Sequence, residues 1–177
     1  FSCGFHPYFL LRERDEAVIK GVDGCDYFDG VKGLPDEHQS GDLVMDHETD
    51  HIFRLPEAPK HEAAILDGSL KRAIAIVSSG NTKLVIWNPG EKVPADQEAD
   101  DWRKFVCVEP VSDWPAGGTL AAGDEHRARG QVHRAVLVGG EHQAEHCLAV
   151  PVLLLNGPSL EGLSLGSGHQ GTGDSTA

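Results

Sequence analysis

The chain has 177 residues and a formal net charge of −13, with 28 acidic residues against 15 lysines and arginines. That charge argues against nucleic acid and anionic membrane surfaces as partners, because both are themselves negatively charged. The length allows one domain with a substantial core, or part of a larger domain.

From Phe1 to about Val132 the sequence predicts an all-β fold. Short runs rich in Val, Ile, Phe and Tyr are separated by clusters of Gly, Pro, Asn and Asp, a spacing typical of an antiparallel β-sandwich. The continuous apolar runs Ala73–Val77 and Leu84–Trp87 belong at the centre of a layered sheet. The predicted strands are His6–Leu11, Glu16–Lys20, Cys25–Asp29, Asp50–Leu55, Ala63–Asp67, Leu70–Ser78, Thr82–Asn88, Lys104–Pro110 and Thr119–Ala122.

Two connections carry local signals. Ser79-Gly80-Asn81 lies between two apolar runs and predicts a tight hairpin. Asp96–Arg103 is the one predicted helix, a short one with Asp96 as its N-cap.

The character of the sequence changes near residue 130. No lysine follows Lys104, no aromatic residue follows Trp114, and 156–177 is rich in Gly and Ser. We therefore divide the chain into a β-sandwich region, residues 1–130, and an atypical low-order tail, residues 131–177. The tail is either natural or the product of a reading-frame change near Gln131, and we favour the second interpretation.

Cysteine usage and the absence of a membrane span bear on location. The four cysteines form no C-x-x-C pair, which favours reduced thiols in a cytoplasmic protein over a zinc ribbon or finger. Leu148–Leu155 is apolar but far too short to cross a membrane. The chain begins at Phe1, inside a predicted strand, so we interpret it as a fragment, and a targeting peptide upstream stays an open alternative.

One segment matches a metal-binding pattern. His47–His51 reads H-E-x-x-H, which binds zinc when both histidines share one helical face. This segment continues into Ile52-Phe53 and predicts a strand, where residues four apart are separated by about 13 Å. We expect no metal and no cofactor.

Two motifs each place a proton-handling side chain among bulky strand formers. These are Phe5–Phe9, which contains His6, and Val106–Pro110, which contains Glu109. A histidine and a carboxylate brought together form an acid/base pair that needs no metal. The alternatives are a core histidine and an edge-strand carboxylate with structural roles only.

These motifs, with Glu48–Phe53 and Val85–Pro89 between them, resemble the galactose mutarotase-like superfamily in order and spacing, and in particular its hexose-6-phosphate mutarotase branch. Leu120–Glu125 resembles the late L-x-x-G-E turn of that family, with Asp124 in place of the glutamate. The resemblance implies a mutarotase-type β-sandwich of which this chain is the C-terminal half. It also implies an isomerase that needs no cofactor and is monomeric when full length.

The resemblance also implies roles for individual residues. His6 matches the general acid, Glu109 the general base, and Asp50 a residue that hydrogen-bonds sugar hydroxyls. Asp50 could equally belong to a solvated acidic face with its neighbours Asp46 and Glu48. Trp87 offers an apolar platform for a sugar ring, with a core tryptophan as the alternative.

Three functions follow as expectations. The first is interconversion of the α and β anomers of a hexose 6-phosphate, as in a glucose-6-phosphate 1-epimerase. The second is an aldose 1-epimerase acting on unphosphorylated sugars, and the third is a non-catalytic carbohydrate-binding β-sandwich. In each case the partner is a small-molecule sugar or sugar phosphate. The phosphate-binding arginines of the family match none of Arg12, Arg14, Arg54 or Arg72.

Overall fold

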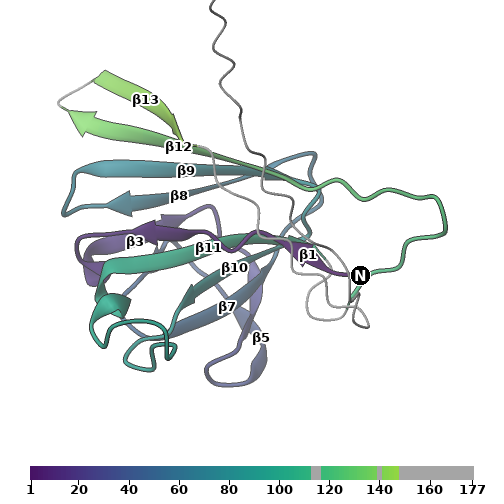
Figure 1. Ribbon diagram of the computed structural model, residues 1–177, viewed down its shortest axis with the longest axis horizontal. Helices are drawn as coiled ribbons and strands as arrows, with labels where there is room; N and C mark the ends of the chain where they lie inside the picture. The colour runs from purple at the N-terminus through teal and green to yellow at the C-terminus, as the bar shows by residue number, and fades with distance from the viewer. Residues whose placement is uncertain (113–116, 139–140, 148–177) are drawn as a thin grey trace, which may run out of the picture.

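The computed structural model describes residues 1–112, 117–138 and 141–147, and within these ranges the chain forms two antiparallel sheets (Figure 1). The first, called the site sheet below, has the strand order β1-β11-β10-β7-β4-β5, with β2 also paired to β11. The second, called the back sheet, has the order β13-β12-β9-β8-β3-β6. The predicted all-β antiparallel sandwich is confirmed.

The bounds of the strands follow the chain. In the site sheet they are β1 (Cys3–Gly4), β2 (Tyr8–Leu10), β4 (Asp26–Asp29), β5 (Leu34–His38), β7 (Thr49–Arg54), β10 (Lys83–Asn88) and β11 (Phe105–Ser112). In the back sheet they are β3 (Ala17–Lys20), β6 (Leu43–Val44), β8 (His61–Asp67), β9 (Arg72–Ser79), β12 (Arg129–Val138) and β13 (Glu141–Cys147). Two 3₁₀ turns, η1 (Arg14–Glu16) and η2 (Asp101–Lys104), complete the described elements.

The core lies between the two sheets. Strand residues alternate between faces, so one side of β11 contributes Val106 and Val108 to this core while its other side carries Cys107 and Glu109. The back sheet contributes Ile65 and Ile76, among others. Burial of this apolar layer is the main force that fixes the strand register, because a slip of one residue would turn each strand inside out.

Several predicted connections are wrong. Ser79-Gly80-Asn81 is not a hairpin, because β9 lies in the back sheet and β10 in the site sheet, so the turn crosses between layers. Thr119–Ala122 is irregular, without a strand. The predicted helix Asp96–Arg103 is replaced by the short η2, which begins after Asp100 instead of Asp96.

The predicted division at residue 130 stays a prediction, but β12 runs across it. Its backbone pairs with β9 from Arg129 to Val136, so ordered sheet continues beyond the expected boundary. Residues 148–177, which make up most of the predicted tail, lie outside the described ranges. The described part of the chain contains no helix with the length and apolar content needed to cross a bilayer.

Candidate active site

His6 lies at a break in the strand that borders β11. Strand β1 pairs with the end of β11 (Gly4 opposite Val111), and β2 pairs with its beginning (Tyr8 opposite Cys107). The register is the same on both sides of the break, which places His6 opposite Glu109. Pro7 lacks an N–H and cannot donate to the ladder, so the backbone departs from regular pairing at this point.

The pleat then brings together side chains from four strands on the outer face of the site sheet. One cross-strand row is Tyr8, Cys107, Trp87 and Asp50, taken from β2, β11, β10 and β7 in turn. The next row holds His6, Glu109, Val85 and Ile52. Residues two apart in each strand share a face, so the two rows form one surface.

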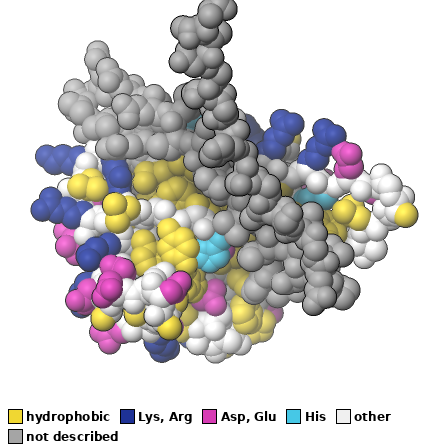
Figure 2. All heavy atoms as spheres, in the orientation of Figure 1, with side chains coloured by type: hydrophobic (Ala, Val, Ile, Leu, Met, Phe, Trp, Pro, Cys, Tyr) yellow, Lys and Arg dark blue, Asp and Glu magenta, His cyan; other side chains and the backbone are white. Residues whose placement is uncertain are grey.

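This surface is hollowed into a pocket with about 660 Å³ of empty space, open to solvent. All four residues that the sequence predicted for the site line it, namely His6, Glu109, Asp50 and Trp87. Figure 2 shows one face of the molecule, on which a histidine lies beside a group of exposed hydrophobic side chains. A pocket with an apolar floor and a few polar groups suits a sugar ring.

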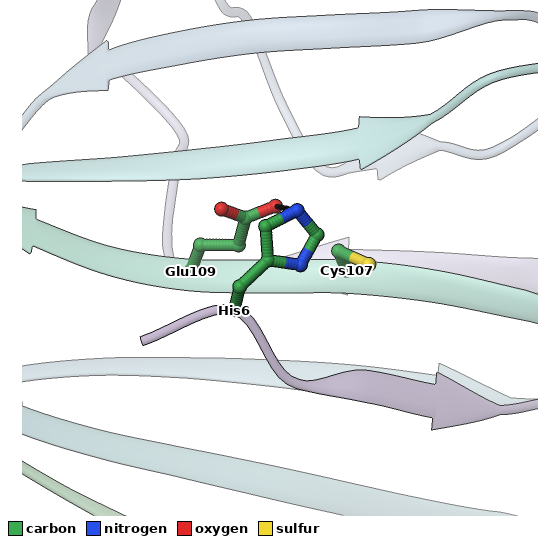
Figure 3. A group of neighbouring side chains, drawn as sticks. All are labelled: His6, Cys107 and Glu109. Carbon is green, nitrogen blue, oxygen red and sulfur yellow. Dashed lines mark ion pairs between the residues drawn. The ribbon is translucent and has the colours of Figure 1, made fainter. Parts of the chain in front are cut away.

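His6 and Glu109 are in direct contact. The distance from His6 Nε2 to Glu109 Oε1 is 3.3 Å, with Glu109 almost fully buried and His6 about one-third exposed. Figure 3 shows the imidazole ring with the Glu109 carboxyl group on one side and Cys107 on the other. A substrate therefore meets both groups from the same side of the sheet, instead of lying between them.

Burial controls the protonation of this pair. It raises the pKa of Glu109 to about 8, and the negative charge of Asp50 adds to that shift. Burial also lowers the pKa of His6 below its ordinary value of 6.5. Both effects favour the neutral forms, a protonated carboxyl group and an uncharged imidazole.

Asp50 is half-buried, and its pKa is raised by burial and by the neighbouring charges of Asp29 and Glu48. A Cβ atom at Gly30 would collide with the Asp50 carboxylate, so only glycine at that position leaves the carboxylate where it is. The backbone N–H of Gly30 also donates to the Asp50 carbonyl oxygen, at 2.7 Å. Asp50 is therefore held at the edge of the pocket by Gly30, the residue that follows β4.

Tyr8 and Cys107 complete the surface and were not predicted as site residues. The Tyr8 ring is half-exposed and lies nearly parallel to the His6 ring, with centroids 5.1 Å apart, and it meets Trp87 edge-on. Cys107 is fully buried beneath these rings. Both could have been found by counting two residues along the strand, from His6 to Tyr8 and from Glu109 to Cys107, because residues two apart in a strand share a face.

Neither histidine of the H-E-x-x-H segment forms part of the site, although Asp50 within that segment lines the pocket. His51 faces the core, with its Nε2 3.7 Å from the Asp29 carboxylate, and burial lowers its pKa to about 4. His47 precedes β7 and contacts Asp46 on the surface. In the described ranges, the cluster with suitable spacing for a metal consists of His6, Cys107 and Glu109 instead.

The two-layer antiparallel sandwich and the histidine–glutamate pair in a small open pocket agree with the resemblance to mutarotases that the sequence motifs carry. The family model for aldose 1-epimerase matches residues 1–133. The chain therefore belongs to the aldose 1-epimerase family, within the galactose mutarotase-like superfamily, and the predicted resemblance to that superfamily is confirmed.

Individual relatives agree with this assignment. A protein of Salmonella typhimurium strain LT2 that carries the name "Putative glucose-6-phosphate 1-epimerase" is 28% identical over 114 residues, which cover 62% of this chain and 37% of the relative. The crystal structure of a "putative mutarotase (YeaD)" from Salmonella typhimurium is similar with a TM-score of 0.57, at 27% identity over 63% of this chain and 38% of that one.

A third structure, of the protein HI1317, shares the fold with a TM-score of 0.59 at 19% identity, covering 75% of this chain and 45% of that protein. The chain thus spans less than half the length of each of these relatives.

Proposed function

We propose that this chain carries the acid/base pair of a sugar 1-epimerase, and that the substrate is a hexose 6-phosphate. The observation that carries the proposal is the contact of His6 with Glu109 in a pocket that Asp50 and Trp87 also line. The choice of a phosphorylated sugar is supported by the motif order and by the name of the Salmonella relative.

The reaction needs two proton transfers and no cofactor. A base removes the proton of the anomeric hydroxyl while an acid protonates the ring oxygen, and the C1–O5 bond breaks to give the free aldehyde. Rotation about the C1–C2 bond exposes the other carbonyl face, and ring closure reverses both proton transfers. In this scheme the Glu109 carboxylate removes the first proton and the His6 imidazolium supplies the second.

The pair reaches that form by an internal proton shift. Burial favours the protonated form of Glu109, and the 3.3 Å contact with His6 Nε2 gives that proton a direct route to the imidazole. A substrate hydroxyl that donates to the carboxylate favours its ionised form and so assists this shift. The number of protons on the pair is unchanged over a full turnover, and no proton is consumed.

The remaining lining residues hold the sugar. Asp50 accepts hydrogen bonds from ring hydroxyls, and the Trp87 face packs against the apolar side of the ring. Both lie in the row next to the acid/base pair, so one sugar ring can contact all four side chains.

An unphosphorylated aldose is the second candidate substrate. Among the described residues that line the pocket there is no lysine or arginine. A phosphate group bound at this site would need cationic partners that those residues do not supply. A lining without cationic side chains favours a free sugar, whereas the relative's name favours the phosphate ester.

The test is the Glu109→Gln variant, which keeps the shape of the side chain and removes the base. We expect the turnover number to fall by roughly two to four orders of magnitude, the usual worth of a positioned acid or base. His6→Asn should give a similar loss. The assay follows pure α-glucose 6-phosphate and pure α-glucose toward anomeric equilibrium, above the spontaneous rate.

Glu91→Gln is the matched control, because the same chemical change is made at an exposed position outside the pocket. Near-normal acceleration by Glu109→Gln would contradict the role of Glu109. Sugar binding by the unsubstituted chain, seen in tryptophan fluorescence but without acceleration of either substrate, would favour the carbohydrate-binding module instead.

A further inference from the structure

We propose that His6, Cys107 and Glu109 form a binding site for Zn²⁺, and that the ion inhibits the epimerase by occupying its acid/base pair. The inhibitory part rests on the proposed function, whereas the binding site stands on geometry alone. One potential ligand atom from each residue lies within 4.8 Å of the other two (Figure 3).

The donor set selects the class of ion. Nitrogen, sulfur and carboxylate oxygen are the three ligand types that zinc uses in proteins, whereas magnesium and calcium require oxygen. His6 and Glu109 already have the spacing of two zinc ligands. Their 3.3 Å separation equals the edge of a tetrahedron around an ion with metal–ligand distances of roughly 2.0–2.2 Å. The thiol completes the set after an approach of about 1 Å or less, within reach of a side-chain rotation.

The histidine is available as a ligand. Its Nδ1 atom is buried and makes no hydrogen bond with any described residue, while Nε2 contacts Glu109. Nε2 is the ligand atom in this geometry, so zinc replaces the contact of Nε2 with Glu109, and Nδ1 carries the ring proton.

The scaffold and the pocket also suit a metal. Cys107 and Glu109 are two residues apart on the same face of β11, which is paired on both edges and fully buried along its length. The pocket in front of His6 is open to solvent and leaves a position for a water ligand, as in zinc sites with three protein ligands.

Binding changes the chemistry of the pair in a defined way. The thiol proton and the proton shared by His6 and Glu109 leave to solvent, and zinc takes the lone pairs that they held. The imidazole can then neither accept nor donate a proton at the sugar, and the carboxylate no longer serves as a base. No electron transfer and no further reactant is required.

Direct binding is tested on the full chain with Cd²⁺ as the spectroscopic probe, because a cadmium–thiolate bond gives a charge-transfer band in the ultraviolet. We expect the band at one equivalent of Cd²⁺ and its loss on addition of Zn²⁺. Cys107→Ser and Cys107→Ala should abolish it. A variant that keeps Cys107 as its single cysteine, with Cys3, Cys25 and Cys147 changed to serine, should retain it.

Two further variants check the other ligands. His6→Asn and Glu109→Gln should keep the thiolate band but weaken the competition by Zn²⁺ by roughly tenfold or more, at least the effect of losing an outer-shell partner. Circular dichroism establishes that each variant is folded. A band that survives in both Cys107 variants, or zinc affinity unchanged by His6→Asn and Glu109→Gln, would overturn the site and indicate adventitious binding to other histidines and cysteines.

The inhibition arm follows the conversion of α-glucose and α-glucose 6-phosphate with and without Zn²⁺, each protein being compared with its own metal-free rate. We expect half-inhibition at the zinc concentration that half-fills the site, and recovery on addition of EDTA. In Cys107→Ser that concentration should rise by roughly tenfold or more. Binding without any catalysis to inhibit would overturn the proposed function and leave the metal site standing. Catalysis without stoichiometric zinc binding would overturn the metal site and leave the proposed function supported.

Discussion

Burial shifts the pKa values of the two members of the acid/base pair in opposite directions. It moves the pKa of Glu109 up to about 8 and the pKa of His6 down from 6.5, so the two values move apart. An isolated carboxyl group and an isolated imidazole would both be mostly deprotonated at pH 7.5. In this site the pair keeps one proton over the neutral range, and epimerisation requires that one proton.

The pH dependence of catalysis follows from this order. Below the lowered pKa of His6 both groups are protonated and no base is present, and above the pKa of Glu109 near 8 both are deprotonated and no acid is present. We expect kcat/KM to follow a bell, with an acid limb below 6.5 and an alkaline limb near pH 8. The measurement is the rate of α-glucose epimerisation in a series of buffers, corrected for the spontaneous reaction.

Glu109→Gln supplies the internal control for that profile. Its residual activity should lack the alkaline limb, since no carboxyl group is left to titrate there. A limb near pH 8 that persists in this variant would assign it to another group.

At the scale of elements, Asn88 connects the end of β10 to the beginning of β11. Its side-chain nitrogen donates to the carbonyl oxygens of Trp102 and Phe105, each at 2.8 Å. Its side-chain oxygen accepts from the Gly90 backbone N–H and from the buried Arg14 guanidinium. One fully buried amide thus fixes η2 and the start of the strand that carries Cys107 and Glu109.

Asn88→Ala should therefore be strongly destabilising. The substitution removes the side-chain hydrogen bonds to two carbonyl oxygens, to the Gly90 N–H and to the Arg14 guanidinium, which keeps Asp15 as its other partner. We expect a loss of roughly 2–4 kcal/mol in the free energy of unfolding. Asn81→Ala is the matched control, because Asn81 is also buried but makes fewer bonds. Among the described residues its side chain donates one hydrogen bond, to the Lys83 carbonyl oxygen, and its own oxygen has no partner. Its cost should be roughly 1 kcal/mol. Equal shifts of the two urea midpoints would contradict the role of Asn88.

The individual strands show which elements of the fold could be predicted from the sequence. The strands with continuous or alternating apolar residues, such as β9 and β10, were predicted because burial produces those patterns directly. Strand β5 (Leu34–His38) was missed because its Leu-Pro-Asp-Glu-His sequence has no strand propensity, and backbone pairing with β4 holds it in place. The hairpin predicted at Gly80 failed because a turn signal does not specify whether the next strand pairs or changes layer.

The site was predictable to a similar degree. The motifs indicated His6, Glu109, Asp50 and Trp87, and all four line one pocket. Cys107 was missed, although it lies two residues from Glu109 and shares its face, because a buried cysteine in an apolar strand has the pattern of a core residue. The catalytic roles themselves remain predictions that the experiments above test.

At the scale of the whole chain, the net charge and the described pocket lining do not by themselves attract the phosphate group of the proposed substrate. The chain carries a formal charge of −13, and the pocket is lined by Asp50 and Glu109 without a lysine or arginine among the described residues. Long-range repulsion and the local charge of Asp50 both act against a sugar phosphate dianion. A neutral hexose experiences neither effect.

Ionic strength separates the two substrates. For this chain we expect kcat/KM with α-glucose 6-phosphate to rise by roughly two- to tenfold between about 0.01 and 0.2 M salt, because counterions screen the repulsion. With α-glucose it should stay constant over the same range, which controls for effects of salt on the protein.

Asp50→Asn removes one negative charge without changing the size of the side chain, and it should raise the ratio of the two kcat/KM values in favour of the phosphate ester. If kcat/KM for the phosphate ester fell with salt instead, attraction would outweigh repulsion. That result would contradict the expected repulsion and reveal a cationic contact with the phosphate in this chain, which would favour the hexose 6-phosphate as the substrate.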